Sequence, residues 1–283
     1  MTPVPDPGRP PGPGDTAPGD GAASRRGADL AKVALVGLAA GFLSGLFGVG
    51  GGVLMVPALV VGLGMGQRLA HGTSLAAIVP IALAGVAGYA LAGEVDWAAS
   101  LFLVVGSAGV GARLGTHLLH VLPQRALALA FSAVMLATAA RMVVGDPEGG
   151  GRPELSVGIA LALVAVGVVA GTTAGLLGVG GGVVMVPAMV VLVGMPAAVA
   201  KGSSLAVIIP TAIVGTRSNL RKRNAEVRTA AVVGLSGLVS SFLASQLSVG
   251  LDERLSNRLF AGLLVVMAAR MLWENRRAPA SRR

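Results

Sequence analysis

The sequence predicts an all-α, polytopic integral membrane protein whose two homologous halves form inverted repeats with glycine-broken half-helices. Three observations predict this fold: an apolar composition, an internal duplication, and equivalent loops of opposite charge. The 283-residue chain is 54% hydrophobic and 12% charged, with a mean hydropathy of +0.78, whereas soluble proteins have about 25% charged residues. The bilayer is therefore the expected solvent for most of the chain.

The net charge of +9 does not indicate nucleic-acid binding, because the basic residues sit in short loops and tails and aromatic residues make up only 3% of the chain. Positive-inside orientation explains them more simply. The chain has no cysteine, which excludes disulfides and thiolate metal sites. The sequence shows no Ser/His/Asp arrangement and no metal-ligand spacing. We therefore expect no enzyme activity, no cofactor and no metal.

The chain contains an internal duplication. Residues Gly41–Pro80 align without a gap on Gly171–Pro210, at a constant offset (171 − 41 = 130). A glycine-rich motif reads GLFGVGGGV in the first copy, from Gly45, and GLLGVGGGV in the second copy, from Gly175. A second motif follows at the same spacing and reads HGTSLA and then KGSSLA. The chain is therefore built from two copies of one unit.

These two motifs, each present twice and in the same order, resemble those of the TauE/SafE family of sulfite and sulfonate exporters. The resemblance covers roughly residues 30–273, and the GEVDW segment at Gly93–Trp97 is also similar to that family. It implies a membrane transporter for a small sulfur-containing anion. The direction, export, is implied by the family alone.

Each half divides into five apolar segments. Those of the first half are 30–47, 53–65, 69–90, 97–120 and 126–144, and those of the second half are 155–177, 183–195, 199–216, 230–249 and 255–273. As helices, segments 53–65 and 183–195 would reach only about 20 Å, whereas a hydrocarbon core is about 30 Å thick. They are therefore predicted to be half-helices.

The domain organisation follows from these segments and from composition. A Pro/Gly-rich tail lacks apolar periodicity and is predicted to be disordered. The predicted parts are the tail 1–29, the first membrane repeat 30–144, a connecting loop 145–154, the second repeat 155–273 and a basic tail 274–283.

Loop charge predicts how the two halves are oriented. Glu94 and Asp96 make one loop acidic, whereas the equivalent loop at 216–228 carries five basic residues and one acidic residue. The basic loop is expected in the cytoplasm. Because equivalent loops then lie on opposite sides, five crossings per half make the repeats inverted. An eight-span alternative with re-entrant short segments places both loops on one face and ranks second.

The glycine runs are the first candidate binding elements. Three consecutive glycines disfavour a regular helix, and broken backbone inside a bilayer has to line a cavity or be covered by protein. Their amides would bind an anion at the positive ends of the short helices. The alternative is close helix packing, which we expect for Gly41, Gly45 and Gly48. The candidate residues are Gly50, Gly51, Gly52, Gly180, Gly181 and Gly182.

Four hydroxyl residues are the second candidate binding elements. Thr73 and Ser74 follow Gly72, and Ser203 and Ser204 follow Gly202 in the other copy. Their hydroxyls could donate to an anion beside the glycine breaks. The alternative is that they cap the helices that follow.

His71 and Lys201 occupy equivalent positions and are candidates for compensating the substrate's charge or for proton coupling. The alternative is that both basic side chains, near segment ends, reach the lipid headgroups.

The favoured hypothesis is secondary transport by alternating access across a bacterial cytoplasmic membrane, with a multi-pass chain and both termini cytoplasmic. We expect a small anion and membrane lipid as partners, exclude nucleic acid, and leave a homo-oligomer open. The alternatives are an anion channel of the same architecture and a non-transporting membrane scaffold.

Overall fold

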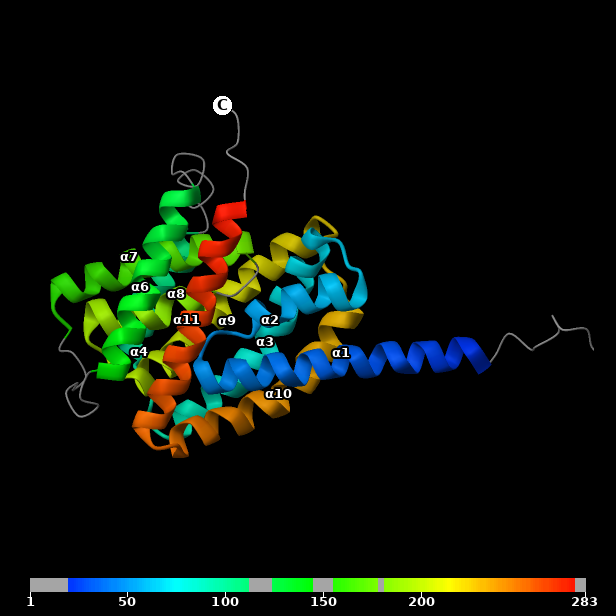
Figure 1. Ribbon diagram of the computed structural model, residues 1–283, viewed down its shortest axis with the longest axis horizontal. Helices are drawn as coiled ribbons and strands as arrows, with labels where there is room; N and C mark the ends of the chain where they lie inside the picture. Colours follow the sequence, from blue (N-terminus) through cyan, green and yellow to red (C-terminus); the bar gives the residue numbers. More distant parts are fainter. Residues whose placement is uncertain (1–19, 112–123, 145–154, 178–180, 278–283) are drawn as a thin grey trace, which may run out of the picture.

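The computed structural model describes residues 20–111, 124–144, 155–177 and 181–277, and these are helical with no β-strand among them (Figure 1). The first half contains α1 (Asp20–Phe47), α2 (Gly52–Pro57) continued by the π-helical η1 (Ala58–Gly62), α3 (Gln67–Leu91), α4 (Trp97–Val104) continued by the π-helical η2 (Val105–Gly111), and α6 (Gln124–Val144). The second half contains α7 (Val157–Leu177), α8 (Gly182–Ala188) continued by the π-helical η4 (Met189–Val193), α9 (Ala197–Arg221), α10 (Val227–Gly250) and α11 (Glu253–Arg277). The predicted all-α fold is confirmed.

The duplication in the sequence is also a duplication of helices. Helix α3 spans Gln67–Leu91 and α9 spans Ala197–Arg221, so both ends differ by the offset of the sequence repeat (197 − 67 = 130). The short helices α2 and α8 begin at Gly52 and Gly182, at that same offset. The two homologous halves therefore contain equivalent helices in the same order.

The short helices have the character expected of half-helices. The continuous apolar helices Gly52–Gly62 and Gly182–Val193 are too short to cross a bilayer, since each would reach less than about 20 Å at 1.5 Å per residue. Among the described residues, four other helices are long and apolar enough to span a membrane: Leu30–Phe47, Gln67–Leu91, Ala197–Arg221 and Val227–Gly250. The predicted glycine-broken half-helices are therefore confirmed. They occur together with helices that are long enough to span the membrane.

Both predicted tails are shorter than expected. Helix α1 begins at Asp20, so residues 20–29 are helical and the predicted disorder up to residue 29 is wrong for them. Helix α11 continues to Arg277, four residues into the predicted basic tail. Helices extend past the apolar segments here because no proline stops them. The rest of both tails lies outside the described residues.

The two halves exchange helices with one another. Helix α1 packs along α10, and α7 packs against α4 and η2, so the first helix of each half contacts the fourth helix of the other. Helix α3 packs against α9, and α6 packs against α11. Figure 1 shows α1 beside α10, and α11 running beside α6. The helix bundle is therefore a joint product of both halves.

Glycines allow α1 to approach α10 closely. A Cβ at Gly41 would clash with the carbonyl of Gly237, and a Cβ at Gly45 would clash with the carbonyl of Ser241. Gly171, the equivalent of Gly41, is packed in the same way against Ser107. Small residues let helix backbones approach closely in a membrane. Moving an apolar side chain from lipid into a helix contact gives no hydrophobic gain, so close packing has to supply the attraction between helices. The close-packing interpretation thus holds for Gly41 and Gly45.

Helices α3 and α9 run antiparallel to one another. A Cβ at Gly215, near the end of α9, would lie 3.0 Å from Leu75, near the start of α3. At the other end, a Cβ at Gly85 would lie 2.9 Å from Leu205. The acidic turn 92–96 consequently lies at the start of α9, and the basic turn 222–226 lies at the start of α3.

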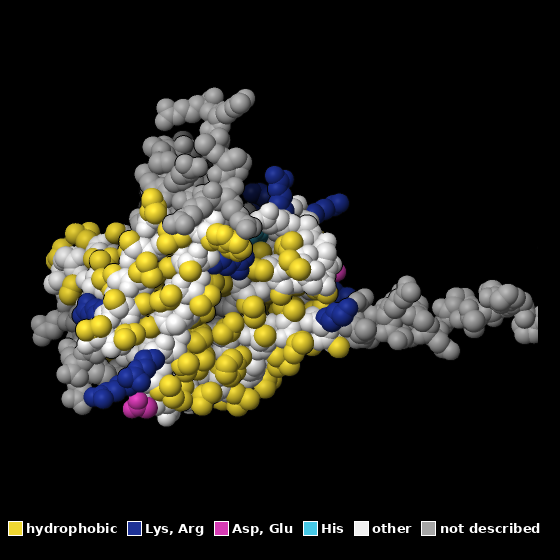
Figure 2. Space-filling model, in the orientation of Figure 1, with side chains coloured by type: hydrophobic (Ala, Val, Ile, Leu, Met, Phe, Trp, Pro, Cys, Tyr) yellow, Lys and Arg dark blue, Asp and Glu magenta, His cyan; other side chains and the backbone are white. Residues whose placement is uncertain are grey.

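The surface of the bundle is strongly apolar. Figure 2 shows a broad hydrophobic face over α1 and α10, with Lys and Arg side chains set mainly around its margins. Exposed large side chains on these two helices include Leu35, Leu38, Leu235, Val239 and Leu243. A face of this kind suits contact with lipid.

We predict that Gly41→Val destabilises the protein by about 3 kcal/mol, because an added side chain overpacks the contact between α1 and α10. Thermal unfolding in detergent measures this as a lower midpoint. Gly62→Val is the matched control, because a Cβ at Gly62 meets nothing within 4 Å. Equal midpoints for the two variants would contradict the close contact.

Candidate functional site

The backbone breaks before the short helices adopt conformations that favour glycine. The φ angles of Gly48, Gly50 and Gly51 are +70°, +80° and +70°, and that of Gly181 is +77°. Side chains with a Cβ are strained in this left-handed region. Gly180 lies outside the described residues.

Each short helix begins from an equivalent glycine. The carbonyl of Gly51 accepts hydrogen bonds from the N–H groups of Leu54 and Met55, at 3.2 and 3.1 Å. The carbonyl of Gly181 accepts from Val184 and Met185, both at 3.1 Å. The N–H groups of the first helical turn have no partner within their own helix and carry the positive end of its dipole. Two equivalent electropositive backbone ends are the result.

The break of the first half is covered by the second half. A Cβ at Gly182 would lie 2.7 Å from the carbonyl oxygen of Gly48 and 2.9 Å from Val49 Cα. The hydroxyl of Ser204 donates a hydrogen bond to the same Gly48 carbonyl. The structure therefore brings Gly182 and Ser204 together with the first break.

The centre between the halves is closed by apolar side chains. A Cβ at Gly50 would lie 3.1 Å from Ile208 and 3.7 Å from Ile78. These two isoleucines occupy equivalent positions in α9 and α3, and both are fully buried. The first break thus meets α3 and α9 at one buried point.

The four hydroxyl residues do not cap helices, so that interpretation is wrong. Helices α3 and α9 begin at Gln67 and Ala197, more than one turn before the hydroxyls. Ser74 instead donates to the carbonyl of His71 at 2.9 Å, and Ser204 donates to the carbonyl of Lys201 at 2.8 Å. All four hydroxyl residues are fully buried inside the helices.

Thr73 and Ser203 face the ends of the bundle. The hydroxyl of Thr73 accepts a hydrogen bond from the backbone N–H of Glu226, and that of Ser203 accepts from Asp96, both at 2.9 Å. Both donors belong to the turn that follows the third helix of the other half. The hydroxyl residues of the motif therefore have different surroundings. Thr73 and Ser203 contact the turns at the ends of the bundle, whereas Ser204 contacts the first glycine break.

Lys201 is buried, so the alternative in which it reaches the lipid headgroups is wrong. Its side chain is 1% exposed, and its Nζ donates to the hydroxyl of Ser256 at 2.8 Å. The ammonium also lies 5.3 Å from the ring centroid of Phe260, a favourable cation–π distance. Phe260 stacks on Phe47, the last residue of α1. His71, the equivalent residue, is half-buried.

Ser44 belongs to this neighbourhood, and sequence reasoning missed it. Its carbonyl accepts the N–H of Gly48 at 2.8 Å. Its hydroxyl is fully buried and has no hydrogen-bond partner among the described residues. The sequence did contain a signal, because Ala174 stands at the equivalent position and a hydroxyl present in one copy alone marks a difference between the halves.

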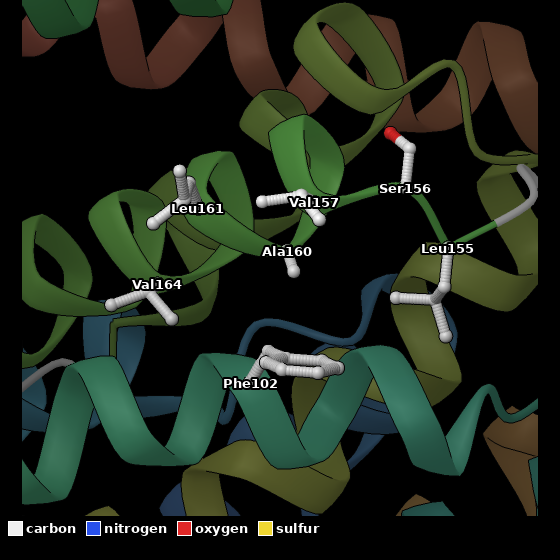
Figure 3. Close-up of a pocket in the computed structure, with 7 residues that line it drawn as sticks. All are labelled: Phe102, Leu155, Ser156, Val157, Ala160, Leu161 and Val164. Atoms are coloured by element: carbon white, nitrogen blue, oxygen red, sulfur yellow. The ribbon is translucent and has the colours of Figure 1, made fainter.

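An open hollow lies elsewhere, between α4 and the start of α7 (Figure 3). Its volume is about 380 Å³, and its walls are almost entirely apolar, formed by Phe102, Leu155, Ser156, Val157, Ala160, Leu161 and Val164. Without a cation in its walls, it does not suit an anion. Within the described ranges, no group of three or more His, Asp or Glu residues is placed to hold a metal ion.

The fold and the buried breaks define a helical membrane protein built from two exchanged repeats. The chain belongs to the TauE/SafE family: the family described as "Sulfite exporter TauE/SafE" matches residues 9–142 and 163–283. The family resemblance seen in the two motifs is therefore confirmed over nearly the whole chain.

Curated relatives carry transporter names. A "Probable membrane transporter protein" of Xylella fastidiosa (strain Temecula1) is 28% identical over 243 residues, which is 83% of this chain and 92% of the relative. "Probable membrane transporter protein YunE" of Bacillus subtilis is 30% identical over 214 residues, 66% of this chain and 76% of the relative. No solved structure matches the chain. Family and relatives support a membrane transporter.

We predict that Gly51→Ala and Gly181→Ala are more damaging than the same change at an open glycine. The added Cβ would meet the carbonyls of Ala40 and Ala170 at 2.5 and 2.7 Å, in addition to the backbone strain of about 1–2 kcal/mol. Gly64→Ala is the matched control, because Gly64 has a φ of +65° and open space around it. Thermal unfolding in detergent should rank both variants below the control. Equal midpoints would show that the breaks have room for a side chain.

Proposed function

We propose that this transporter moves a small oxyanion or organosulfonate, with sulfite as the first candidate, across the cytoplasmic membrane. Export is the direction that the family description favours. The observation that carries the proposal is the meeting of Gly182 and Ser204 with the first glycine break. Backbone amides and a hydroxyl beside a positive helix end bind anions without a full charge.

In this proposal, the site lies between the halves. The amides of Gly50, Gly51 and Gly52 bind from the first half, and those of Gly180, Gly181 and Gly182 bind from the second. Ser204 contributes its hydroxyl, with Ser74 in the equivalent role. Thr73 and Ser203 face the end turns, so we assign them no direct substrate contact.

Lys201 is the proposed source of positive potential near the site. Its Cα lies 2.6 Å from the Cβ position of Gly48, so its backbone borders the first break. Its Nζ donates a hydrogen bond to Ser256 and lies within cation–π distance of the Phe260 ring. His71 has the same position in the other half, and we propose it as the corresponding group there.

The orientation proposed for the chain is that of inverted repeats. Antiparallel packing of α3 and α9 supports it, because equivalent helices then cross the membrane in opposite directions. The acidic turn 92–96 and the basic turn 222–226 lie at opposite ends of this pair. The positive-inside rule places the basic turn in the cytoplasm, and both termini with it.

A carrier is favoured over an anion channel of the same architecture. The isoleucines at 78 and 208 fill the space beside Gly50, whereas an ion filter has to leave a continuous path. A closed centre suits a site that is reached from one side at a time.

The proposal is tested by sulfite and sulfoacetate efflux from proteoliposomes that contain the purified protein, with and without an imposed proton gradient. We expect saturable efflux, with counterflow. Ser204→Ala should weaken apparent affinity at least tenfold, because a hydrogen bond to a charged group contributes about 1.5–3 kcal/mol.

Ser236→Ala is the control for that variant, since the hydroxyl of Ser236 bonds to carbonyls of its own helix. It should transport like the wild type. Absence of flux of both compounds in well-inserted protein would refute the substrate class. Flux without saturation or counterflow would favour the channel.

A further inference from the structure

Two matched contacts, which we name end latches, join the halves at opposite ends of the α3 and α9 pair. In the acidic-end latch, the backbone N–H of Asp96 donates to the hydroxyl of Ser203 at 2.9 Å. In the basic-end latch, the backbone N–H of Glu226 donates to the hydroxyl of Thr73 at 2.9 Å. Donors and acceptors are equivalent residues, so one contact occurs twice.

A close backbone contact accompanies each hydrogen bond. A Cβ at Gly202 would clash with the carbonyl of Glu94, and a Cβ at Gly72 would clash with the carbonyl of Asn224. The glycine of the HGTSLA and KGSSLA motifs is therefore needed because the turn of the other half sits directly on the helix. Each latch holds only while the turn and the helix remain in contact.

The turns cover the ends of the bundle. Thr73 and Ser203 are fully buried beneath them, and Val95 of the acidic turn is 5% exposed. Val95 Cγ2 lies 3.1 Å from the Cβ position of Gly202, so this side chain fills the gap at the acidic end. At the basic end, the equivalent Ala225 is half-buried. Each turn thus covers one buried hydroxyl of the repeated motif.

The acidic-end latch is connected to the glycine break through neighbouring residues. Ser203 accepts from the acidic turn, and Ser204, the next residue, donates to the Gly48 carbonyl. One turn of α9 therefore contacts both the end of the bundle and its centre. A shift of α9 at the break would therefore also move the Ser203 hydroxyl relative to the acidic turn.

We propose that the end latches are the two gates of this transporter, and that they open one at a time. The proposal rests on the transport function inferred above. Because α3 and α9 are antiparallel, a tilt of one against the other lengthens the contact at one end while the other end stays closed. The structure, in which both latches are formed, corresponds to the occluded arrangement.

The chemistry of the contact suits a gate. The turns carry exposed residues at Gly93 and Arg223, so water reaches their outer side. When a latch opens, water replaces the protein partner of the freed N–H and hydroxyl groups, and the hydrogen bonds are exchanged rather than lost. Opening therefore leaves no buried polar group without a partner.

The absence of native cysteine makes disulfide locking a direct test. One variant carries Thr73→Cys with Glu226→Cys, and the other carries Ser203→Cys with Asp96→Cys. In each pair, the side-chain oxygen of one residue accepts a hydrogen bond from the backbone N–H of the other at 2.9 Å, so the two backbones lie close enough for a disulfide to be attempted. Oxidation should reduce anion flux at least tenfold in each variant, and a reductant should restore it.

The matched control is Leu38→Cys with Ser240→Cys. These residues also join the two halves, because the Ser240 hydroxyl donates to the Leu38 carbonyl at 2.8 Å, but they lie on α1 and α10, which pack along their glycines. We expect this pair to move as one body, so its oxidation should leave at least half of the flux.

A labelling experiment separates gating from substrate choice. Ile208→Cys, placed beside the first break, is added to each latch variant and challenged with a membrane-impermeant thiol reagent. With the acidic-end latch locked, labelling should occur from the basic side alone, and with the basic-end latch locked, from the acidic side alone. If labelling depends on the locked latch in this way but neither sulfite nor sulfoacetate is transported, the proposed substrate is wrong and the proposed gates are supported.

The proposal is overturned if flux continues at more than half its level in a fully cross-linked latch variant, or if labelling is independent of which latch is locked. Where a pair fails to cross-link, Gly72→Val and Gly202→Val replace it. The added side chain at position 72 should displace the basic turn, and the one at position 202 should displace the acidic turn. Each variant should therefore be labelled only from the end whose turn is displaced. Equal labelling from both sides in these variants also contradicts the gates.

Discussion

The cover that the second half gives to the first glycine break is the constraint on which the rest of the structure depends. Backbone that leaves a helix inside a bilayer needs cover, because lipid neither donates nor accepts a hydrogen bond. Gly182 packs on Gly48, and Ser204 donates to the Gly48 carbonyl. The first half alone would leave the Gly48 carbonyl without its Ser204 partner, so the halves have to assemble around this break.

Helix exchange is the consequence of this requirement. The first helix of each half packs on the fourth helix of the other, which places the breaks between the halves rather than on the surface. The exchanged helices then approach until their backbones touch. At Gly41, Gly45 and Gly171, an added Cβ would clash with a backbone carbonyl of the neighbouring helix. The apolar outer face needs no specific partner, because lipid supplies it.

The sequence predicts what is local and what is repeated. Glycine runs between apolar segments predict the breaks, and a constant offset predicts that α2 and α8 are equivalent. Partners across the halves are not readable in this way: the hydroxyl of Thr73 accepts from a backbone amide 153 residues away, and almost every residue carries such an amide. For the same reason, Lys201 resembles a headgroup-facing lysine until its contact with α11 is known.

The duplicated backbone carries different side chains at its two ends. Gly93 and Arg223 hold the same place in their turns with φ angles of +75° and +55°, so the left-handed conformation is retained where glycine is not. Tyr89 and Asn219 are another such pair, as are His71 and Lys201. A carrier exposes one site to both sides in turn. Symmetric glycines and hydroxyls cannot by themselves distinguish those sides, so any directional preference has to arise from the pairs that differ.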